Sequence, residues 1–267
     1  MNDSLSPLTL LAIEAALQAG DIVRQGYGTS FKISNKEGVH NLVTEYDHLS
    51  EKSIVDFLSQ HAPTSQFLAE ESGASGTHNS ELLWIIDPLD GTVNFAHQVP
   101  HFAVSIAAVK KGVPIAGVIY QPLTHELFVA EKGTGAFLNG APIRVSPVAA
   151  LEKSFLATGF PYNLSENPHH CIDHFVDLLK LGLPIRRLGA ATLDFAYVAA
   201  GRFEAFFEVS LAPWDCAAGV LLVEEAGGRV TAWDHRKPFD IHSYQPILAT
   251  NRALHPALSA VLMREVR

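Results

Sequence analysis

Two segments near the start of the chain place polar and apolar residues at helical spacing. Residues 8–27 are mostly apolar or small, apart from one polar stripe whose members recur every three or four positions: Glu14, Gln18, Asp21 and Gln25. Residues 47–60 gather large apolar side chains on one side: Leu49, Ile54, Phe57 and Leu58. Both patterns predict amphipathic helices, the first beginning beside Pro7, where a missing N–H does no harm.

The pattern changes to short apolar runs between residues 82 and 143. The expected strands are 82–86, 102–110, 115–120 and 127–130. Short turn signals separate them, and such connections favour antiparallel pairing. After about residue 148, predicted helices at 192–200 and 215–226 alternate with expected strands at 154–158, 205–207, 229–231 and 247–249. The alternation predicts an α+β fold with helices layered on sheets.

Composition narrows the class of protein. The chain has 267 residues, of which 48% are hydrophobic and 18% charged, which is enough apolar material for a full core and argues against disorder. A net charge of −9 argues against general nucleic-acid binding, although Arg186-Arg187 is a local basic pair. No apolar run approaches the ~20 residues of a membrane span, and the first residues lack a basic leader region. With only two cysteines, we expect a cytoplasmic protein and no membrane association.

The stretch WIIDPLDGTVNF, residues 84–95, ends an apolar run in two carboxylates. We expect the strand to end at Ile86, with Pro88 stopping its ladder and Asp87 and Asp90 returning to one side of the turn. The N–H groups of Gly91 and of Thr92 would open a short helix or nest, which attracts phosphate. Carboxylate oxygens suit Mg²⁺ or Mn²⁺. The stretch therefore predicts a cation site beside an anion seat.

Two other acidic stretches add candidate carboxylates to this site. LAEES carries Glu70 and Glu71, and APWDCAAG carries Asp215, which we interpret as the N-cap of an apolar helix. Alone, two acids in a loop or a capping aspartate would be ordinary surface features. Together they supply what metal-assisted phosphoryl transfer needs, because several carboxylates must converge on two cations.

These motifs carry a family resemblance. Glu70-Glu71-Ser72, the 87–95 stretch and Trp214-Asp215-x-Ala217-Ala218-Gly219 resemble the inositol monophosphatase family, part of a lithium-sensitive, magnesium-dependent phosphatase superfamily that includes fructose-1,6-bisphosphatase. The resemblance implies a layered αβαβα sandwich, a homodimer, and hydrolysis of a phosphate monoester on a small polyol, inositol 1-phosphate first. It divides the chain into an N-terminal half, 1–148, and a C-terminal half, 149–267.

The resemblance also implies a role for particular residues. The first of two or three Mg²⁺ ions, Mn²⁺ being possible, would be held by Glu70, Asp87, the carbonyl of Leu89 and Thr92. The second would be held by Asp87, Asp90 and Asp215, and Glu70 would share a third. Thr92, backed by Asp47, would activate the attacking water, with no covalent phosphoenzyme. The phosphate would lie on the N–H groups of Gly91 and Thr92. The substrate hydroxyls would be met by Asp90, Ala191, Glu208 and Asp215.

Other interpretations compete with this one. Histidinol phosphate or another small phosphate monoester would suit a similar site, since Glu208 could pair with an ammonium group. Some bacterial relatives assist transcription, so a binding role with catalysis secondary is an alternative of another class. An aspartyl-nucleophile phosphatase is disfavoured, because the two acids of that motif are two positions apart, whereas Asp87 and Asp90 are three apart. The segment 161–174 follows no family pattern, and we expect substrate preference to reside there.

Three further patterns have simpler structural explanations. The glycine-rich run 133–140 fits a hairpin turn at Asn139-Gly140 better than a nucleotide loop. His170 and His174 are spaced for zinc on a helix, but a solvated or capping pair is favoured. Cys216, beside Asp215, is expected to be a packed small residue and not a reactive thiolate.

Overall fold

The computed structural model describes residues 5–36 and 41–265. The helices are α1 (Pro7–Gly26), α2 (Glu45–His61), α3 (Thr92–Ala96), α4 (Cys171–Lys180), α5 (Ala191–Ala199), α6 (Pro213–Glu225) and α7 (His255–Leu262). The strands of the first half are β1 (Ile33–Asn35), β2 (Leu42–Thr44), β3 (Gln66–Ala69), β4 (Gly73–Gly76), β5 (Leu82–Asp90), β6 (Ala103–Lys110), β7 (Val113–Gln121), β8 (Glu126–Glu131), β9 (Gly135–Leu138) and β10 (Ala141–Pro142). Those of the second half are β11 (Leu156–Thr158), β12 (Ile185–Arg186), β13 (Ala205–Glu208), β14 (Arg229–Ala232) and β15 (Ile247–Thr250).

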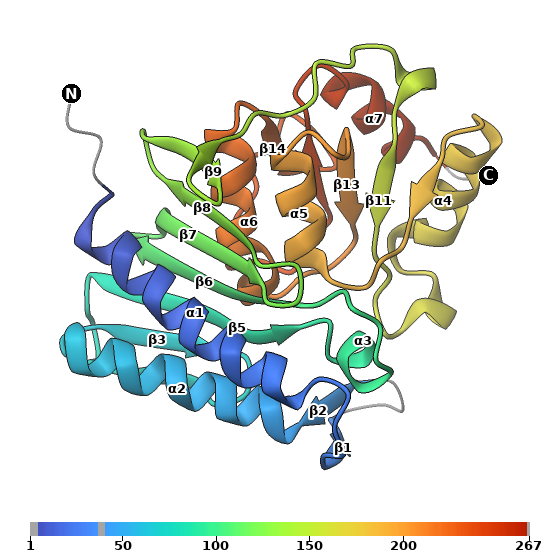
Figure 1. The fold of residues 1–267 in the computed structure, drawn as a ribbon. Coiled ribbons are helices and arrows are strands. Elements are labelled where there is room, and N and C mark those ends of the chain that lie inside the picture. The colour runs from blue at the N-terminus through green and yellow to red at the C-terminus, as the bar shows by residue number, and fades with distance from the viewer. Residues whose placement is uncertain (1–4, 37–40, 266–267) are drawn as a thin grey trace.

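The elements form alternating layers of helices and sheets (Figure 1). Helices α1 and α2 cover the outer face of a sheet of order β10-β9-β8-β7-β6-β5-β3-β4. Helices α5 and α6 fill the space between this sheet and a second one, of order β12-β11-β13-β15-β14, whose far face packs on α4 and α7. The predicted αβαβα sandwich is therefore confirmed.

The two N-terminal helices form where their patterns predict them. Helix α1 begins at Pro7, with the Ser6 hydroxyl accepting from the N–H of Thr9, and it buries an alanine-rich face. Helix α2 begins at Glu45, two residues before the expected start, because Thr44 caps it and Asp47 binds back to the Thr44 N–H at 2.8 Å. None of the helices in the described ranges is both long and apolar enough to cross a membrane.

Strand pairing decides which acids become neighbours. Strands β5 to β8 are antiparallel, as predicted, and Leu138 pairs with Ala141 across the expected Asn139-Gly140 turn. Strand β3, which the sequence pattern did not predict, runs parallel to β5 and pairs Ala69 with Ile86. That register places Glu70 beside Asp87 at the same end of the sheet.

Strand β5 does not end at Ile86, so the expected strand end is wrong. Asp87 still pairs with Ser105 of β6, and the ladder resumes where Asp90 pairs with Ala103. The register shifts between Asp87 and Asp90, because Pro88 has no N–H to donate while β6 continues beside it. Such an irregularity changes the direction of the side chains, and here it lies between the two aspartates.

Candidate active site

Four carboxylates reach one region from three different parts of the chain. Glu70 follows β3, Asp87 and Asp90 belong to the end of β5, and Asp215 lies in the first turn of α6. The interpretation of Asp215 as an N-cap is wrong. The N-cap position is Ala212, and Asp215 is the third helical residue, whose Oδ2 accepts from the Ala212 N–H at 2.8 Å.

Hydrogen bonds orient three of these carboxylates by holding one oxygen of each. Oδ1 of Asp87 accepts from the Leu89 N–H at 3.0 Å, and Oδ2 of Asp90 accepts from the Thr192 N–H at 2.7 Å and from its hydroxyl. With Asp215 held by Ala212, the second oxygen of each aspartate has a fixed direction. Thr192 therefore links α5 to the acids of the first sheet, a role that the sequence analysis did not find.

The charges of neighbouring acids affect the pKa values of the three aspartates. Burial, and then the charges of Glu70, Asp90 and Asp215, hold the pKa of Asp87 well above its usual range. Burial and the charges of Asp90 and Glu70 do the same for Asp215. The pKa of Asp90 rises to about 6, because desolvation outweighs the hydrogen bonds from Thr192. A divalent cation would reverse these shifts by neutralising the cluster.

An ammonium group already occupies the edge of the cluster. Lys36 Nζ lies 2.8 Å from Glu70 Oε1 and 2.5 Å from Glu71 Oε1, and these charge pairs raise the pKa of Lys36 despite its burial. Glu51 fixes the same loop by accepting from the N–H of Glu71 at 2.8 Å and of Ser72 at 2.9 Å. Neither Lys36 nor Glu51 could be predicted from the sequence, because neither belongs to a motif and both depend on tertiary contacts.

The donor set suits a hard divalent cation, since all four side chains offer carboxylate oxygens, and one of them, Glu70, already binds the Lys36 ammonium. Within residues 5–36 and 41–265, however, no three His, Cys, Asp or Glu side chains stand close enough to enclose an ion as they are. With the three aspartates held by hydrogen bonds, Glu70 is the side chain that would have to move to complete a ligand shell, and it would have to leave Lys36.

Asp47 and Thr92 form a buried pair beside these acids. Asp47 Oδ2 accepts from the N–H and the hydroxyl of Thr44, at 2.8 and 2.6 Å. Thr92 Oγ1 lies 2.9 Å from Asp47 Oδ1 and 2.9 Å from the Leu89 carbonyl oxygen. The single hydroxyl proton can serve only one of these two acceptors at a time. Burial is the main reason that the pKa of Asp47 is raised.

The turn and the short helix predicted at Gly91 and Thr92 are present. Gly91 has a φ of 90°, and α3 begins at Thr92, as expected. A Cβ on Gly91 would stand 2.9 Å from the His101 carbonyl oxygen, so this turn requires glycine. Neither the Gly91 nor the Thr92 N–H donates a hydrogen bond within the described part of the chain, which leaves both available to an anion.

Two predicted substrate contacts come from the second half of the chain. Ala191 is half-buried at the start of α5, and Glu208 is buried at the end of β13. Burial, followed by the charge of Asp90, raises the pKa of Glu208 to about 8. Gly159 packs so closely on this carboxyl that a Cβ there would stand 2.1 Å from Glu208 Oε2.

The remaining sequence candidates lie apart from the acids. His170 occupies the N-cap position of α4, whereas His174 is buried against Trp233, so the two histidines do not form a solvated pair. Cys216 is buried, as expected, and burial holds the pKa of its thiol well above the usual range. Arg186 stacks its guanidinium 4.8 Å from the centre of the Phe155 ring.

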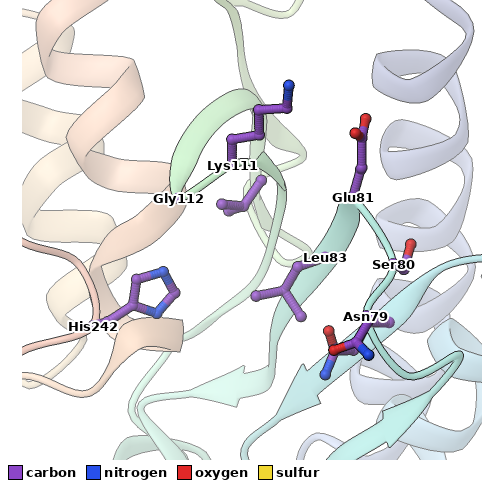
Figure 2. Close-up of a pocket in the computed structure, with 9 residues that line it drawn as sticks. Asn79, Ser80, Glu81, Leu83, Lys111, Gly112 and His242 are labelled. Carbon is purple, nitrogen blue, oxygen red and sulfur yellow. The ribbon is translucent and has the colours of Figure 1, made fainter.

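A separate pocket opens at the opposite end of β5 (Figure 2). Its volume is about 280 Å³, and its lining residues are Gln66, Asn79, Ser80, Glu81, Leu83, Val109, Lys111, Gly112 and His242. Figure 2 shows His242 approaching Leu83 from the C-terminal half. None of the predicted site residues lines this pocket.

A layered αβαβα fold with acidic side chains gathered beside an anion seat defines a metal-dependent phosphate-ester hydrolase. The chain belongs to the inositol monophosphatase family, whose family model matches residues 4–267. It is therefore an enzyme of the inositol monophosphatase type, a phosphoric monoester hydrolase, and the family is magnesium-dependent.

Similar proteins carry two kinds of name. The inositol-1-monophosphatase of Synechocystis sp. is 41% identical over 94% of this chain and 87% of its own length. The Nus factor SuhB of Pseudomonas aeruginosa is 45% identical over 85% and 86%. The solved structure of the extragenic suppressor protein suhB from Bartonella henselae has a TM-score of 0.92 at 40% identity, covering 98% of this chain and all of that one. An inositol monophosphatase/NADP phosphatase solved with Mg²⁺ and phosphate is 28% identical, covers 93% and 92%, and has a TM-score of 0.81.

Proposed function

We propose that the protein hydrolyses myo-inositol 1-phosphate to myo-inositol and phosphate. The observation that carries the proposal is the cluster of four carboxylates from three parts of the chain, in which burial, and then the charges of Glu70 and Asp90, raise the pKa of Asp87 and of Asp215. Beside it lie the Gly91 and Thr92 N–H groups, which donate no hydrogen bond within the described residues. The relatives named inositol-1-monophosphatase at 41% identity support this substrate over other small phosphate monoesters.

Both halves of the chain would contribute cation ligands. Residues 1–148 supply Glu70, Asp87, Asp90, Thr92 and the Leu89 carbonyl as cation ligands, and residues 149–267 supply Asp215. Bound Mg²⁺, in two or three positions and replaceable by Mn²⁺, would lower the pKa of a water and neutralise charge on the phosphate and leaving oxygen.

The Asp47–Thr92 pair would receive the proton from the attacking water. When Thr92 donates its hydroxyl proton to Asp47 Oδ1, a lone pair of Oγ1 faces the site and accepts a hydrogen bond from water. As the water oxygen bonds to phosphorus, its proton passes to Oγ1 and the threonine proton passes to Asp47. The ester oxygen leaves with the bonding electron pair and takes a proton from solvent. No side chain becomes phosphorylated.

The phosphate and the leaving group would be held by different halves. The N–H groups of Gly91 and Thr92 would hold phosphate oxygens, while Ala191 and Glu208, with Asp90 and Asp215, would border the polyol hydroxyls. Glu208 has a pKa of about 8, so near neutral pH its carboxyl can donate one hydrogen bond and accept others.

The deciding experiment measures phosphate release from myo-inositol 1-phosphate by the purified protein. We expect rapid release with magnesium, loss of release with EDTA, and inhibition by tens of millimolar lithium. Histidinol phosphate and glycerol 2-phosphate serve as comparison substrates. A folded, magnesium-treated protein that releases phosphate from none of them would contradict the proposal. Faster turnover of histidinol phosphate than of myo-inositol 1-phosphate would make histidinol phosphate the proposed substrate.

A second function, in transcription, is favoured by the relatives named Nus factor SuhB. Binding of the transcription machinery would use surface features outside the acid cluster, and the exposed Arg186-Arg187 pair is the basic feature to test. We expect Asp87→Asn to keep co-purification with RNA polymerase while losing hydrolysis. Loss of co-purification in that variant, or none with the wild-type protein, would argue against the second function. We further propose a cytoplasmic homodimer.

A further inference from the structure

Tyr162 is a large exposed aromatic side chain that no predicted role explains. Its exposed fraction is 70%, the largest among the exposed large hydrophobic side chains of the described residues. It lies in the 161–174 segment, whose sequence follows no family pattern. A single exposed ring is ordinary on a protein surface, so a role for Tyr162 depends on what lies around it.

The path of the chain brings Tyr162 from the substrate side of the site. Strand β11 ends at Thr158, paired with Phe207, and Gly159 then packs against the carboxyl of Glu208. Phe160 anchors the segment by an edge-to-face contact with Phe175 of α4, at 5.3 Å between ring centres. Tyr162 therefore lies two residues after the Phe160 anchor and three residues after Gly159, which packs on Glu208.

Charges of acids from both halves of the chain act on the phenol of Tyr162. Partial desolvation, and then the charges of Glu70 and Asp215, raise the pKa of the Tyr162 phenol, with Lys36 acting in the opposite direction. Together with the contact of Gly159 on Glu208, these charges put Tyr162 near the acid cluster, on the side that Glu208 borders.

We propose that the Tyr162 ring is the wall against which the leaving group of the substrate packs, so that the site selects phosphate monoesters whose leaving group has a ring face. This inference rests on the proposed function. The acids fix the phosphorus end of the substrate, Glu208 borders the hydroxyls, and the aromatic face covers the C–H face of a ring. An aromatic wall tolerates different rings, because packing on its face needs no particular hydrogen-bond pattern.

The test compares Tyr162→Ala, which removes the ring, with Tyr162→Phe, which removes only the hydroxyl. Tyr244→Ala is the matched control, since Tyr244 is 64% exposed and lies two residues from His242 of the distant pocket. The substrates are myo-inositol 1-phosphate, a nucleoside 3′-phosphate and the acyclic glycerol 2-phosphate. Steady-state kinetics give kcat and KM for each, and inhibition by inorganic phosphate reports on the phosphate seat.

We expect Tyr162→Ala to raise KM for both ring-bearing esters about tenfold with kcat nearly unchanged, because a packing contact present before and during reaction affects binding alone. KM for glycerol 2-phosphate and inhibition by phosphate should stay within about twofold of wild type, as should every constant of Tyr162→Phe and Tyr244→Ala.

Equal losses for ring-bearing and acyclic esters, or no loss, would overturn the inference while leaving the proposed function intact. A large loss in Tyr162→Phe would also overturn it, because the contact would then belong to the hydroxyl. If the wild-type protein hydrolyses none of the three esters, the proposed function fails and this inference falls with it.

Discussion

The two ends of strand β5 carry very different surroundings. At its start, the pocket of Figure 2 has a volume of about 280 Å³ and exposed groups of both signs, Glu81 and Lys111 among them. At its other end, Asp87 and Asp90 meet acids from elsewhere in the chain and have raised pKa values. The hollow shape marks the first end, whereas concentrated like charge marks the second. The acid end is therefore the candidate active site, because clustered acids with raised pKa values are typical of functional sites.

The acid end is built from elements that are distant in sequence. Strand β3 supplies Glu70, β5 supplies two aspartates, and the first turn of α6 supplies Asp215. Thr192 of α5 donates to Asp90, and Ser50 of α2 donates to the Pro88 carbonyl oxygen at 2.7 Å. Such cross-links keep the repelling carboxylates in place. A bound cation would turn their repulsion into attraction and would stabilise the folded protein.

The largest expected effect is a loss of activity when the acid end of β5 is changed but not when its pocket end is changed. Asp90→Asn should lower kcat/KM for the physiological ester on the order of 10³-fold or more, because a proposed cation ligand loses its charge. The asparagine amide oxygen can still accept from Thr192, so the fold should survive. Glu81→Gln makes the same kind of change at the pocket end, on an exposed side chain, and should leave kcat/KM within about twofold.

Phosphate release and thermal unfolding, measured with and without magnesium, check this comparison. Asp90→Asn should also lose much of the magnesium-induced rise in Tm, whereas Glu81→Gln should keep it. Equal activity in the two variants would break the comparison, since the charged end of β5 would then have no special role. A comparable loss in Glu81→Gln would instead link the pocket to the reaction.

Sequence patterns predicted the parts of this molecule that local rules determine. Helices α1 and α2 follow from the spacing of their polar and apolar residues, α5 and α6 from their apolar stretches, and the hairpin at Asn139-Gly140 from turn chemistry. The αβαβα architecture, by contrast, was predicted through family resemblance. So were the roles of Glu70 and Asp215, because a lone acid in a loop or at a helix start carries no signal of its own.

The errors and omissions arise where tertiary contacts decide. β5 continues past Pro88 because β6 runs on beside it, and no local pattern reports a neighbouring strand. Lys36 reaches Glu70 and Glu71 from 34 and 35 residues away along the chain. His174 is buried because α4 packs near Trp233, although its spacing from His170 looked like that of a surface pair.

A smaller difference between the two ends is expected in the pH dependence of the free energy of unfolding, measured on metal-free protein. Glu208 keeps its proton in the folded state up to a pH of about 8, but in the unfolded chain it ionises near its ordinary value of 4.5. Between these two values unfolding releases a proton, so raising the pH favours unfolding. The free energy of unfolding should therefore fall with pH by up to about 1.4 kcal/mol per pH unit for this group, and the fall should level off above its folded pKa.

Glu208→Gln should remove this contribution, because a neutral amide of similar shape has no proton to release. Chemical denaturation of the metal-free variant should therefore show a shallower fall between about pH 6 and pH 8, while the fall below pH 6 remains, since Asp90 titrates at about 6. Glu81→Gln should keep the wild-type slope, because Glu81 is exposed at the pocket end. An unchanged slope in Glu208→Gln would mean that this carboxyl is already ionised in the folded protein. It would then accept hydrogen bonds from substrate hydroxyls but could not donate one, and the stability cost of the acid end would rest on the β5 aspartates and Asp215.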